Sequence, residues 1–392
     1  MQRGAVVGRV EASLARIARL DPEFRAFAEV WEEEARSRAW SVDTALPLAG
    51  LPFAVKGPSG IRSYAAGRLI EAGAVPVGAT AVPGPGTSWQ TWGLGRYGRT
   101  VNPYRDDRTP GGSSAGAAVA VATGMVPLAT GSDGAGSVRI PAAWCGVFGL
   151  KTTNGLLPSP DRTGLAAAGV LARRVPVAEA CLRCLLGPGA GACGPTEDAV
   201  PAVYAQDLGF AEVDDEVAAV ARAGVERLRA AGVVRLAPLP GQGDFALADP
   251  REAWFAIRAG ARDTPRGPEA DDAAHGGAAG PALRAAAENS RRLRGLFARV
   301  PLLLSPATPH RPHGHEGPGD QYSTALAWAF NVSGHPAASI PAGHTRDGCP
   351  VGLQLVAAHG GERLLLAVAR AAEHVPGGPA GWSRRRRTHG GG

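Results

Sequence analysis

Two serine–glycine clusters and two lysines are the residues whose types and spacing suggest chemistry. The clusters, GGSSAG at 111–116 and GSDGAGS at 131–137, each place serine hydroxyls among small residues. Of 41 basic residues only Lys56 and Lys151 are lysines. A guanidinium stays charged at any working pH, whereas a buried ammonium can lose its proton. A lysine in a chain that otherwise uses arginine is therefore either a candidate general base or a residue at a site too tight for arginine.

The first cluster formally matches the G-x-S-x-G elbow of α/β-hydrolases, with Ser114 as the nucleophile. That motif requires a strand before the serine and a helix after it. The preceding NPYRDDRTPGG contains two prolines and several charges, which is not typical of a central strand. A Ser-x-x-Lys dyad is excluded, because Phe53 and Phe148 stand three residues before the lysines.

The second cluster is the better candidate for a catalytic segment. Small residues before Ser137 allow consecutive backbone N–H groups to turn towards one point, where they would stabilise negative charge on an oxygen. Asp133 and Arg139 bracket this segment and could pair to hold it. A glycine-rich turn without chemistry fits the heptapeptide equally well. A phosphate-binding P-loop is excluded, because no Gly-Lys-Ser/Thr follows.

The elements that would position these clusters alternate between helices and strands. Apolar periodicity predicts helices over 4–40 with a break at Asp21-Pro22, and over 115–124, 175–186, 214–231, 250–262, 281–298 and 360–373. Buried strands are predicted within 46–57, 68–82, 126–133, 300–309, 335–343 and 351–358. This alternation predicts an α/β fold: one large domain over 1–375, with a mostly parallel, twisted mixed sheet covered by helices on both faces. We expect a long flexible loop at 263–280 and a disordered Gly/Arg-rich tail at 376–392.

Composition and charge limit the classes of protein to which the chain can belong. The 392 residues are 45% hydrophobic and 19% charged, as in a globular chain. We expect a cytoplasmic protein, because the N-terminus has no signal-peptide core and no run reaches the roughly 18 apolar residues that a membrane span needs. The formal charge of +6 includes four arginines at 384–387, without which it is +2. We therefore expect neither a nucleic-acid nor a membrane partner.

No metal or cofactor is predicted. The five cysteines are an odd number, which fits a reducing compartment. Cys181 and Cys184 form a C-x-x-C, but VAEACLRCLLG is typical of a helix with both thiols on its apolar side. His310, His313 and His315 lie in a Pro/Gly loop and make only a weak case for metal binding.

Lys56 after an apolar strand, GGSSAG, and then GSDGAGSVRIPAAWCGVFGLKTTNG closely resemble the amidase signature family of Ser-cisSer-Lys amidohydrolases. RIARLDPEFRAFAEV, RLIEAGAVPVGATAVP and SPATP…FNVSGHPAASIPAG…DGCPVGLQLVAA resemble their counterparts there as well. The resemblance implies that Ser137 is the acylated nucleophile. It makes Ser113, after a cis peptide, the bridging serine and Lys56 the base. The implied oxyanion hole consists of the N–H groups of Gly134, Ala135, Gly136 and Ser137, with Ser114, Asp133 and Arg139 around it.

The departures from the family pattern are few. Ala115 and Ala135 stand where glycine is common, which is tolerable unless φ is positive there. Lys151-Thr152-Thr153 replaces the usual Lys-Pro-Thr, and we interpret Lys151 as fixing local structure rather than acting in catalysis. The chain is shorter than typical members between about 190 and 300, a region that helps to shape the acyl pocket.

The resemblance predicts an amidohydrolase that cleaves a small-molecule amide through an acyl-enzyme, without a cofactor, and that could form a homodimer. The alternatives are a biosynthetic acyltransferase that uses the same acyl-enzyme, an amidotransferase subunit, or a catalytically silent binding module. Each aromatic residue near the motifs could line the pocket or pack in the core: Trp89, Trp92, Tyr97, Trp144, Trp328 and Phe330.

Overall fold

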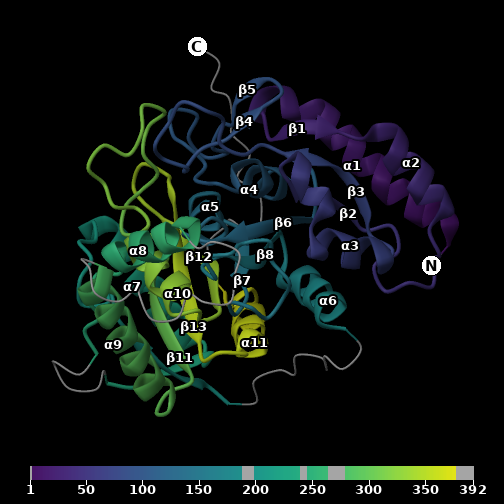
Figure 1. The fold of residues 1–392 in the computed structure, drawn as a ribbon. Coiled ribbons are helices and arrows are strands. Elements are labelled where there is room, and N and C mark those ends of the chain that lie inside the picture. The colour runs from purple at the N-terminus through teal and green to yellow at the C-terminus, as the bar shows by residue number, and fades with distance from the viewer. Residues whose placement is uncertain (1, 188–197, 239–244, 264–278, 377–392) are drawn as a thin grey trace.

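The apolar runs of the sequence become neighbouring strands of one large sheet with helices on both faces (Figure 1). The structure is a computed structural model that describes residues 2–187, 198–238, 245–263 and 279–376. The predicted loop at 263–280 and the predicted tail at 376–392 lie almost entirely outside the described residues.

The eleven-stranded sheet has the order β1-β3-β2-β6-β8-β7-β12-β13-β11-β9-β10. Its strands are β1 (Phe27–Val30), β2 (Pro52–Lys56), β3 (Val75–Thr80), β6 (Leu128–Asp133), β7 (Phe148–Lys151), β8 (Ala167–Ala172), β9 (Val200–Tyr204), β10 (Val234–Leu236), β11 (Leu302–Pro306), β12 (Ala337–His344) and β13 (Pro350–Ala357). A separate hairpin pairs β4 (Leu94–Gly95) with β5 (Gly98–Arg99).

Helices cover the sheet, and helices are found in each segment where they were predicted. They are α1 (Arg3–Phe24), α2 (Glu32–Ser41), α3 (Tyr64–Glu71), α4 (Ala115–Ala122), α5 (Arg139–Trp144), α6 (Val175–Leu186), α7 (Asp215–Ala230), α8 (Arg251–Asp263), α9 (Ala279–Phe297), α10 (Ala325–Val332) and α11 (Glu362–Ala372), with a short 3₁₀ helix, η1 (Pro58–Arg62). The break predicted at Asp21-Pro22 is wrong, because Pro22 lies inside the first helix and strand β1 interrupts the 4–40 segment instead. The helices over 139–144 and 325–332 were not predicted. The α/β class and the helices on both faces are as predicted.

The sheet is mixed. Parallel pairs join β3–β2–β6 and β11–β9–β10, whereas antiparallel pairs join the strands between them and the edge strand β1. Parallel pairing therefore extends over less of the sheet than the sequence suggested. The reason is that an apolar run indicates a strand buried on both faces, whatever the direction of its neighbours.

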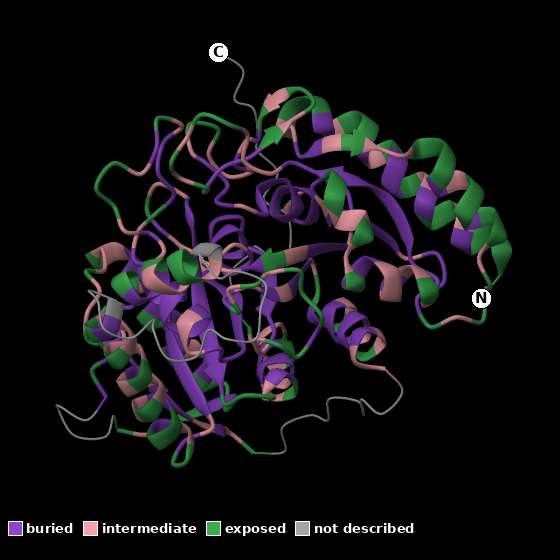
Figure 2. Cartoon of the chain, in the orientation of Figure 1, coloured by how far each residue is buried: buried purple, intermediate pink, exposed green. Residues whose placement is uncertain are grey.

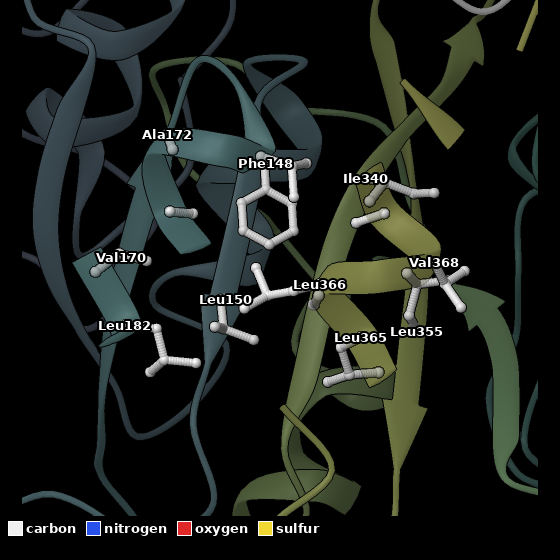
Figure 3. Packing of buried hydrophobic residues seen from close by; sticks show 14 of the residues in the cluster. Phe148, Leu150, Val170, Ala172, Leu182, Ile340, Leu355, Leu365, Leu366 and Val368 are labelled. Carbon is white, nitrogen blue, oxygen red and sulfur yellow. The ribbon is translucent and has the colours of Figure 1, made fainter. Parts of the chain in front are cut away.

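Alternate residues of single strands enter different apolar clusters, which is why both faces of the sheet are buried (Figure 2). On β2, Phe53 and Val55 pack in the cluster that contains α3, α6, α7 and α11, whereas Ala54 packs against α1 and α4. Phe148 and Leu150 of β7 lie in the former cluster beside residues of α11 (Figure 3). The period of two sets this alternation.

Small residues let α4 approach the sheet closely. A Cβ on Gly116 would lie 2.1 Å from the carbonyl oxygen of Ala26 and 2.4 Å from the nitrogen of Ala81, so only glycine fits. The helix predicted over 115–124 is therefore present and packs tightly on its neighbours. It also fixes the residues just before α4, which belong to the first serine cluster.

Candidate active site

The topology brings Lys56 and the two serine clusters together. Lys56 ends β2 and Asp133 ends β6, and these adjacent strands run parallel, so their carboxyl ends meet at one edge of the sheet. Ser113 lies just before α4, and Ser137 lies just before α5. Side chains at the carboxyl ends of parallel strands and in the turns that follow them are well placed to converge on one site.

These three side chains form a hydrogen-bonded chain. Lys56 Nζ is 2.9 Å from Ser113 Oγ, and Ser113 Oγ is 3.1 Å from Ser137 Oγ. Lys56 Nζ also donates to the carbonyl oxygen of Ser132 at 3.0 Å, which fixes the head group at the end of β6. The peptide bond between Gly112 and Ser113 is cis, as the resemblance implies. The arrangement allows a proton to pass from Ser137 to Lys56 through one intermediate hydroxyl.

The environment of Lys56 suits a base. Burial lowers the pKa of Lys56 to about 8, and the Asp133 carboxylate opposes this shift. A lysine with its ordinary pKa would be almost entirely protonated at neutral pH, whereas this one is neutral in a usable fraction of molecules. The first interpretation of the scarce lysines, a general base, therefore has structural support at this position.

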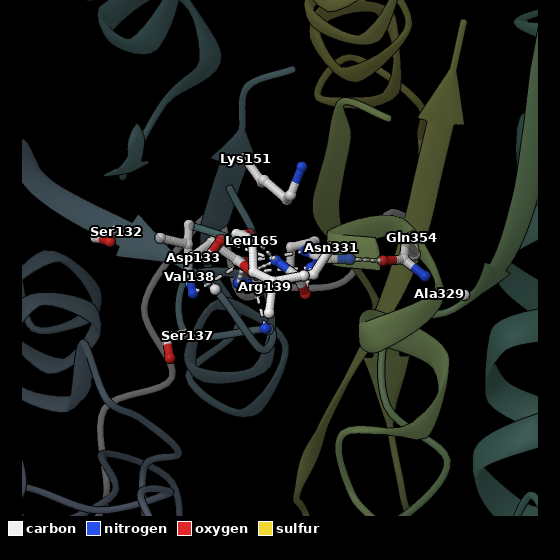
Figure 4. Close-up of polar contacts among 12 residues, drawn as sticks. Ser132, Asp133, Ser137, Val138, Arg139, Lys151, Leu165, Ala329, Asn331 and Gln354 are labelled. Atoms are coloured by element: carbon white, nitrogen blue, oxygen red, sulfur yellow. Dashed lines mark hydrogen bonds and ion pairs between the residues drawn. The ribbon is translucent and has the colours of Figure 1, made fainter. Parts of the chain in front are cut away.

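A buried ion pair holds the second serine cluster in shape (Figure 4). Arg139 and Asp133 are fully buried and make two contacts, Nη2–Oδ1 at 2.9 Å and Nε–Oδ2 at 3.0 Å. Burial would raise the pKa of Asp133, but the Arg139 guanidinium holds it well below its usual range. Arg139 Nη1 donates to Gln354 of β13, and Nη2 donates also to Asn331 of α10, each at 2.7 Å. The prediction that Asp133 and Arg139 pair is confirmed.

The Asp133 carboxylate also accepts backbone N–H groups from Gly136 at 2.8 Å, Val138 at 3.1 Å and Arg139 at 3.3 Å. The Gly136 N–H is therefore engaged, so the structure removes it from the expected oxyanion donors. Gly134, Ala135 and Ser137, in contrast, line a cavity. Gly136 instead allows the turn to form, because its φ is +90° and there is no room for a Cβ beside Ile140.

Two cavities meet at Lys56 and Ser113. The first, of about 980 Å³, also contains Ser137, Gly134 and Ala135, and we call it the Ser137 cavity. The second, of about 920 Å³, lies against η1 and the 158–161 loop without reaching Ser137, and we call it the Pro158 cavity. Ser137 thus opens into one cavity, while Lys56 and Ser113 border both.

The aromatic residues proposed for the pocket divide into two groups. Trp89 and Trp328 line the Ser137 cavity. The others do not line it: Trp92 bonds Thr87, Trp144 bonds Thr308, and Tyr97 is half exposed. Phe330 is buried in the core.

Sequence reasoning missed the residues that α8 and the 318–324 loop bring to the Ser137 cavity. Trp254 stacks on Trp328 with 4.4 Å between ring centroids and donates from Nε1 to the carbonyl oxygen of Gly134 at 2.8 Å. Arg251, Phe255, Arg258 and Tyr322 complete this wall. The available signal was a predicted amphipathic helix at 250–262 with aromatic residues at adjacent positions. No sequence signal in or near that helix predicted that it lies beside the serine clusters.

Ser114 is not placed as an α/β-hydrolase nucleophile. Its Oγ is buried without a hydrogen-bond partner among the described residues, and the residue lines neither cavity. The chain between β5 and α4 is irregular, so the strand that the elbow motif requires is missing. That interpretation is wrong for this chain.

Lys151 is fully buried at the end of β7 and lines neither cavity. Its Nζ donates to the Thr152 carbonyl at 3.0 Å, the Asn154 Oδ1 at 2.7 Å and the His335 carbonyl at 2.9 Å. Three acceptors match the three donors of an ammonium. The contacts support a structural role, because they tie β7 to the start of β12.

The described cysteines and histidines form no metal centre. Within residues 2–187, 198–238, 245–263 and 279–376, no group of three potential ligands converges. Cys181 and Cys184 are free thiols on α6, and Cys193 lies outside the described residues. His310 contacts Asp214, His313 contacts Thr91, and His315 contacts the Asp106 carbonyl.

Among the helices of the described residues, none combines the length and the apolar character that crossing a membrane requires.

Comparisons with known proteins show the family to which the chain belongs. The amidase family model matches residues 57–238 and 278–366. The 6-aminohexanoate-cyclic-dimer hydrolase of Paenarthrobacter ureafaciens is 31% identical over 468 residues, covering 96% of this chain and 92% of that protein. A glutamyl-tRNA(Gln) amidotransferase subunit of a Synechococcus strain is 29% identical over 451 residues, covering 92% of each.

A solved structure of 6-aminohexanoate cyclic dimer hydrolase has a TM-score of 0.79 and 27% identity, covering 99% of this chain and 95% of that one. The fold and the site therefore define an enzyme of the amidase signature type. The chain belongs to the amidase family, and it is an amidase that acts on carbon–nitrogen bonds.

Proposed function

We propose that this enzyme hydrolyses a small-molecule amide through an acyl-enzyme on Ser137. The observation that carries the proposal is the chain Lys56 Nζ–Ser113 Oγ–Ser137 Oγ, with steps of 2.9 and 3.1 Å. A serine hydroxyl is a weak nucleophile unless an adjacent base takes its proton. Here the base is a lysine whose pKa burial has lowered to about 8.

In the proposed cycle, neutral Lys56 accepts the proton of Ser113 while Ser113 accepts that of Ser137. The Ser137 oxygen then bonds to the amide carbonyl carbon, and the carbonyl oxygen becomes negative. As this oxyanion collapses, the C–N bond breaks. The Ser113 proton passes to the departing nitrogen, and the Lys56 ammonium restores it. Water then attacks the ester on Ser137 by the same relay, which releases the acid and the free enzyme.

The oxyanion would be stabilised by backbone N–H groups of the turn before Ser137. Gly134, Ala135 and Ser137 face the Ser137 cavity, and none of their N–H groups is used in the contacts that Asp133 makes. Fixed donors of this kind stabilise the charge without reorganisation during the reaction. Ala135 replaces a common glycine without strain, because its φ is not positive.

The two cavities suggest where the acyl group and the leaving amine of the substrate bind. The acyl group stays bonded to Ser137, so it would occupy the Ser137 cavity. The leaving amine takes its proton from Ser113, which also borders the Pro158 cavity. We therefore assign the Pro158 cavity to the amine as it departs, or to the water that replaces it.

An amidotransferase role is the second candidate, because a relative with that function is 29% identical over most of both chains. The same acyl-enzyme would form, and ammonia would go to a partner instead of to solvent. Two measurements separate the candidates. An isolated chain that releases ammonia or amine in steady turnover is a hydrolase, whereas an amidotransferase subunit co-purifies with a partner and depends on it.

A serine-directed fluorophosphonate with peptide mapping tests the proposal. We expect labelling at Ser137, no labelling in Ser137→Ala, and labelling slowed by about a hundredfold or more in Lys56→Ala, because a general base of this type is worth about 10²–10⁴-fold. Labelling at Ser114 in the wild-type enzyme would contradict the mechanism.

The rate of this labelling should rise with pH. Lys56 must be neutral to act, and its pKa is about 8, so the rate should climb between about pH 6 and pH 9 and level off above the pKa. Lys56→Ala serves as the control, because its residual rate lacks this titration. Circular dichroism over the same range verifies that the fold is unchanged. A wild-type rate that is flat or falls with pH excludes Lys56 as the base.

A further inference from the structure

One wall of the Ser137 cavity carries cations without acids. Arg251 and Arg258 of α8 both line this cavity. Among the described residues that line it, none is an aspartate or a glutamate. Charged residues of one sign in a cleft attract ligands of the opposite sign.

Aromatic rings hold the two guanidiniums in place. The Arg251 guanidinium carbon lies 3.9 Å from the centroid of Tyr322, and that of Arg258 lies 4.6 Å from the centroid of Trp254. Within the described part of the chain, neither guanidinium is in an ion pair. Stacking on an aromatic face orients a guanidinium and leaves its edge donors open to a carboxylate.

Two buried polar atoms on the same wall have no protein partner among the described residues. They are the Trp328 Nε1 and the Ser323 Oγ, and both residues line the cavity. The indole nitrogen can only donate, and the hydroxyl can donate. Buried polar groups are rarely left without a partner, so this wall holds unused donors next to the cavity.

The acids near this wall do not neutralise it. Asp249 accepts from the Tyr322 hydroxyl at 3.2 Å and from the Arg251 backbone N–H at 2.9 Å. Glu252 and Asp320 are exposed, and neither they nor Asp249 line the cavity. The charged side chains that α8 brings to the cavity are therefore cations, and they lie on an aromatic surface.

We propose that this wall binds a carboxylate at the far end of the acyl group, so that the substrate is an amide of an acid with a second, anionic group on an apolar spacer. The proposal rests on the proposed function, since the acyl group must lie on Ser137. The arginines bind the carboxylate, and the Trp254, Trp328 and Tyr322 rings contact the spacer. Water-exposed guanidiniums give a moderate effect, a preference of about tenfold over the neutral analogue.

Paired fluorophosphonates test the proposal without knowledge of the substrate. Each pair has alkyl chains of equal length that end in a carboxylate or in a methyl group, and several lengths are compared. The ratio of the two Ser137 labelling rates is measured in each enzyme. For the wild type we expect a ratio of about ten at the best length, falling as salt is added, because salt screens exposed charges.

In the Arg251→Gln/Arg258→Gln double variant the ratio should fall to about one, since the charges are gone. Arg235→Gln is the matched control: Arg235 is exposed on β10 and lines neither cavity, so the ratio should stay at its wild-type value. Because each ratio is internal to one enzyme, a general loss of reactivity does not mimic the effect.

A wild-type ratio of one or less at every chain length, or an unchanged ratio in the double variant, overturns the carboxylate site and leaves the acyl-enzyme mechanism standing. Failure of both probes to label wild-type Ser137 overturns the mechanism, and the carboxylate site with it.

Discussion

Lys56→Arg is expected to lower kcat/KM for amide hydrolysis by about a thousandfold or more, although it preserves the positive charge. A guanidinium does not give up its proton at any working pH, so the relay would have no acceptor. Removing one member of a nucleophile–base unit typically costs about as much as removing the whole unit. A panel of chromogenic anilides supplies the assay, and Ser113→Ala should match the loss because Ser113 is the bridge between Lys56 and Ser137.

Ser114→Ala is the matched control for Ser113→Ala. The two serines are adjacent, but Ser114 Oγ is buried without a hydrogen-bond partner among the described residues and lines neither cavity. We expect kcat/KM to stay within about twofold of the wild type, since the change removes only a hydroxyl that makes no bond. Substantial activity in Lys56→Arg, or equal losses in Ser113→Ala and Ser114→Ala, would show that the proton follows another route.

The residues of the proposed proton relay could be predicted because each lies in a short segment with a local signal. Ser113 and Ser137 stand in dense small-residue clusters, and Lys56 follows an apolar strand in a chain that otherwise uses arginine. The position of Lys56 beside the clusters follows from parallel pairing of β2 and β6. Composition alone singled out the two lysines, whereas the roles of Ser113 and Ser137 came from the family resemblance that these short segments carry.

The pocket could not be predicted in the same way. Trp92 and Trp144 lie as close to the motifs in sequence as Trp89 does, but they bond Thr87 and Thr308 instead of facing the cavity. Closeness in sequence does not determine which way a side chain points in an irregular segment. Trp254 reaches the site only through the packing of α8, which no local pattern encodes.

Several elements were also missed for physical reasons. β8 is AAGVLA and β7 is FGLK, and such short runs of small or apolar residues fit a strand and a buried helix alike. Asn331 and Gln354 could have been noticed, because each is a polar residue inside an apolar segment. A buried polar side chain needs a partner, and here the partner is Arg139.

Asp133→Ala is expected to cost about 3–5 kcal/mol of unfolding free energy, the range for breaking a buried ion pair by removing one partner. The change leaves the fully buried Arg139 guanidinium with only Asn331 and Gln354. It also removes the acceptor of three backbone N–H groups, at Gly136, Val138 and Arg139. Chemical denaturation of the purified enzyme measures the loss. The probe rate at Ser137 should fall too, because the same bonds shape the turn before that serine.

Arg139→Met is expected to cost less than Asp133→Ala. The carboxylate would keep its three backbone donors and the Asn331 amide at 3.0 Å, so its charge would stay partly compensated. Arg36→Ala is the control: Arg36 pairs with Glu11 on the surface, where both side chains are more than 40% exposed, and no measurable change is expected. If Arg139→Met proves the more damaging, the guanidinium and its two amide partners hold the site, and the turn depends on them rather than on Asp133.

The pH dependence of these losses separates a charge effect from a packing effect. The folded-state pKa of Asp133 lies below the unfolded value of about 4, so its contribution is fully present above that value and declines as the pH falls below it. The difference in stability between wild type and Asp133→Ala should therefore be constant near neutrality and shrink in acid. A difference that stays constant down to low pH would mean that the packing and hydrogen bonds of the carboxyl group, and not its charge, hold the turn before Ser137.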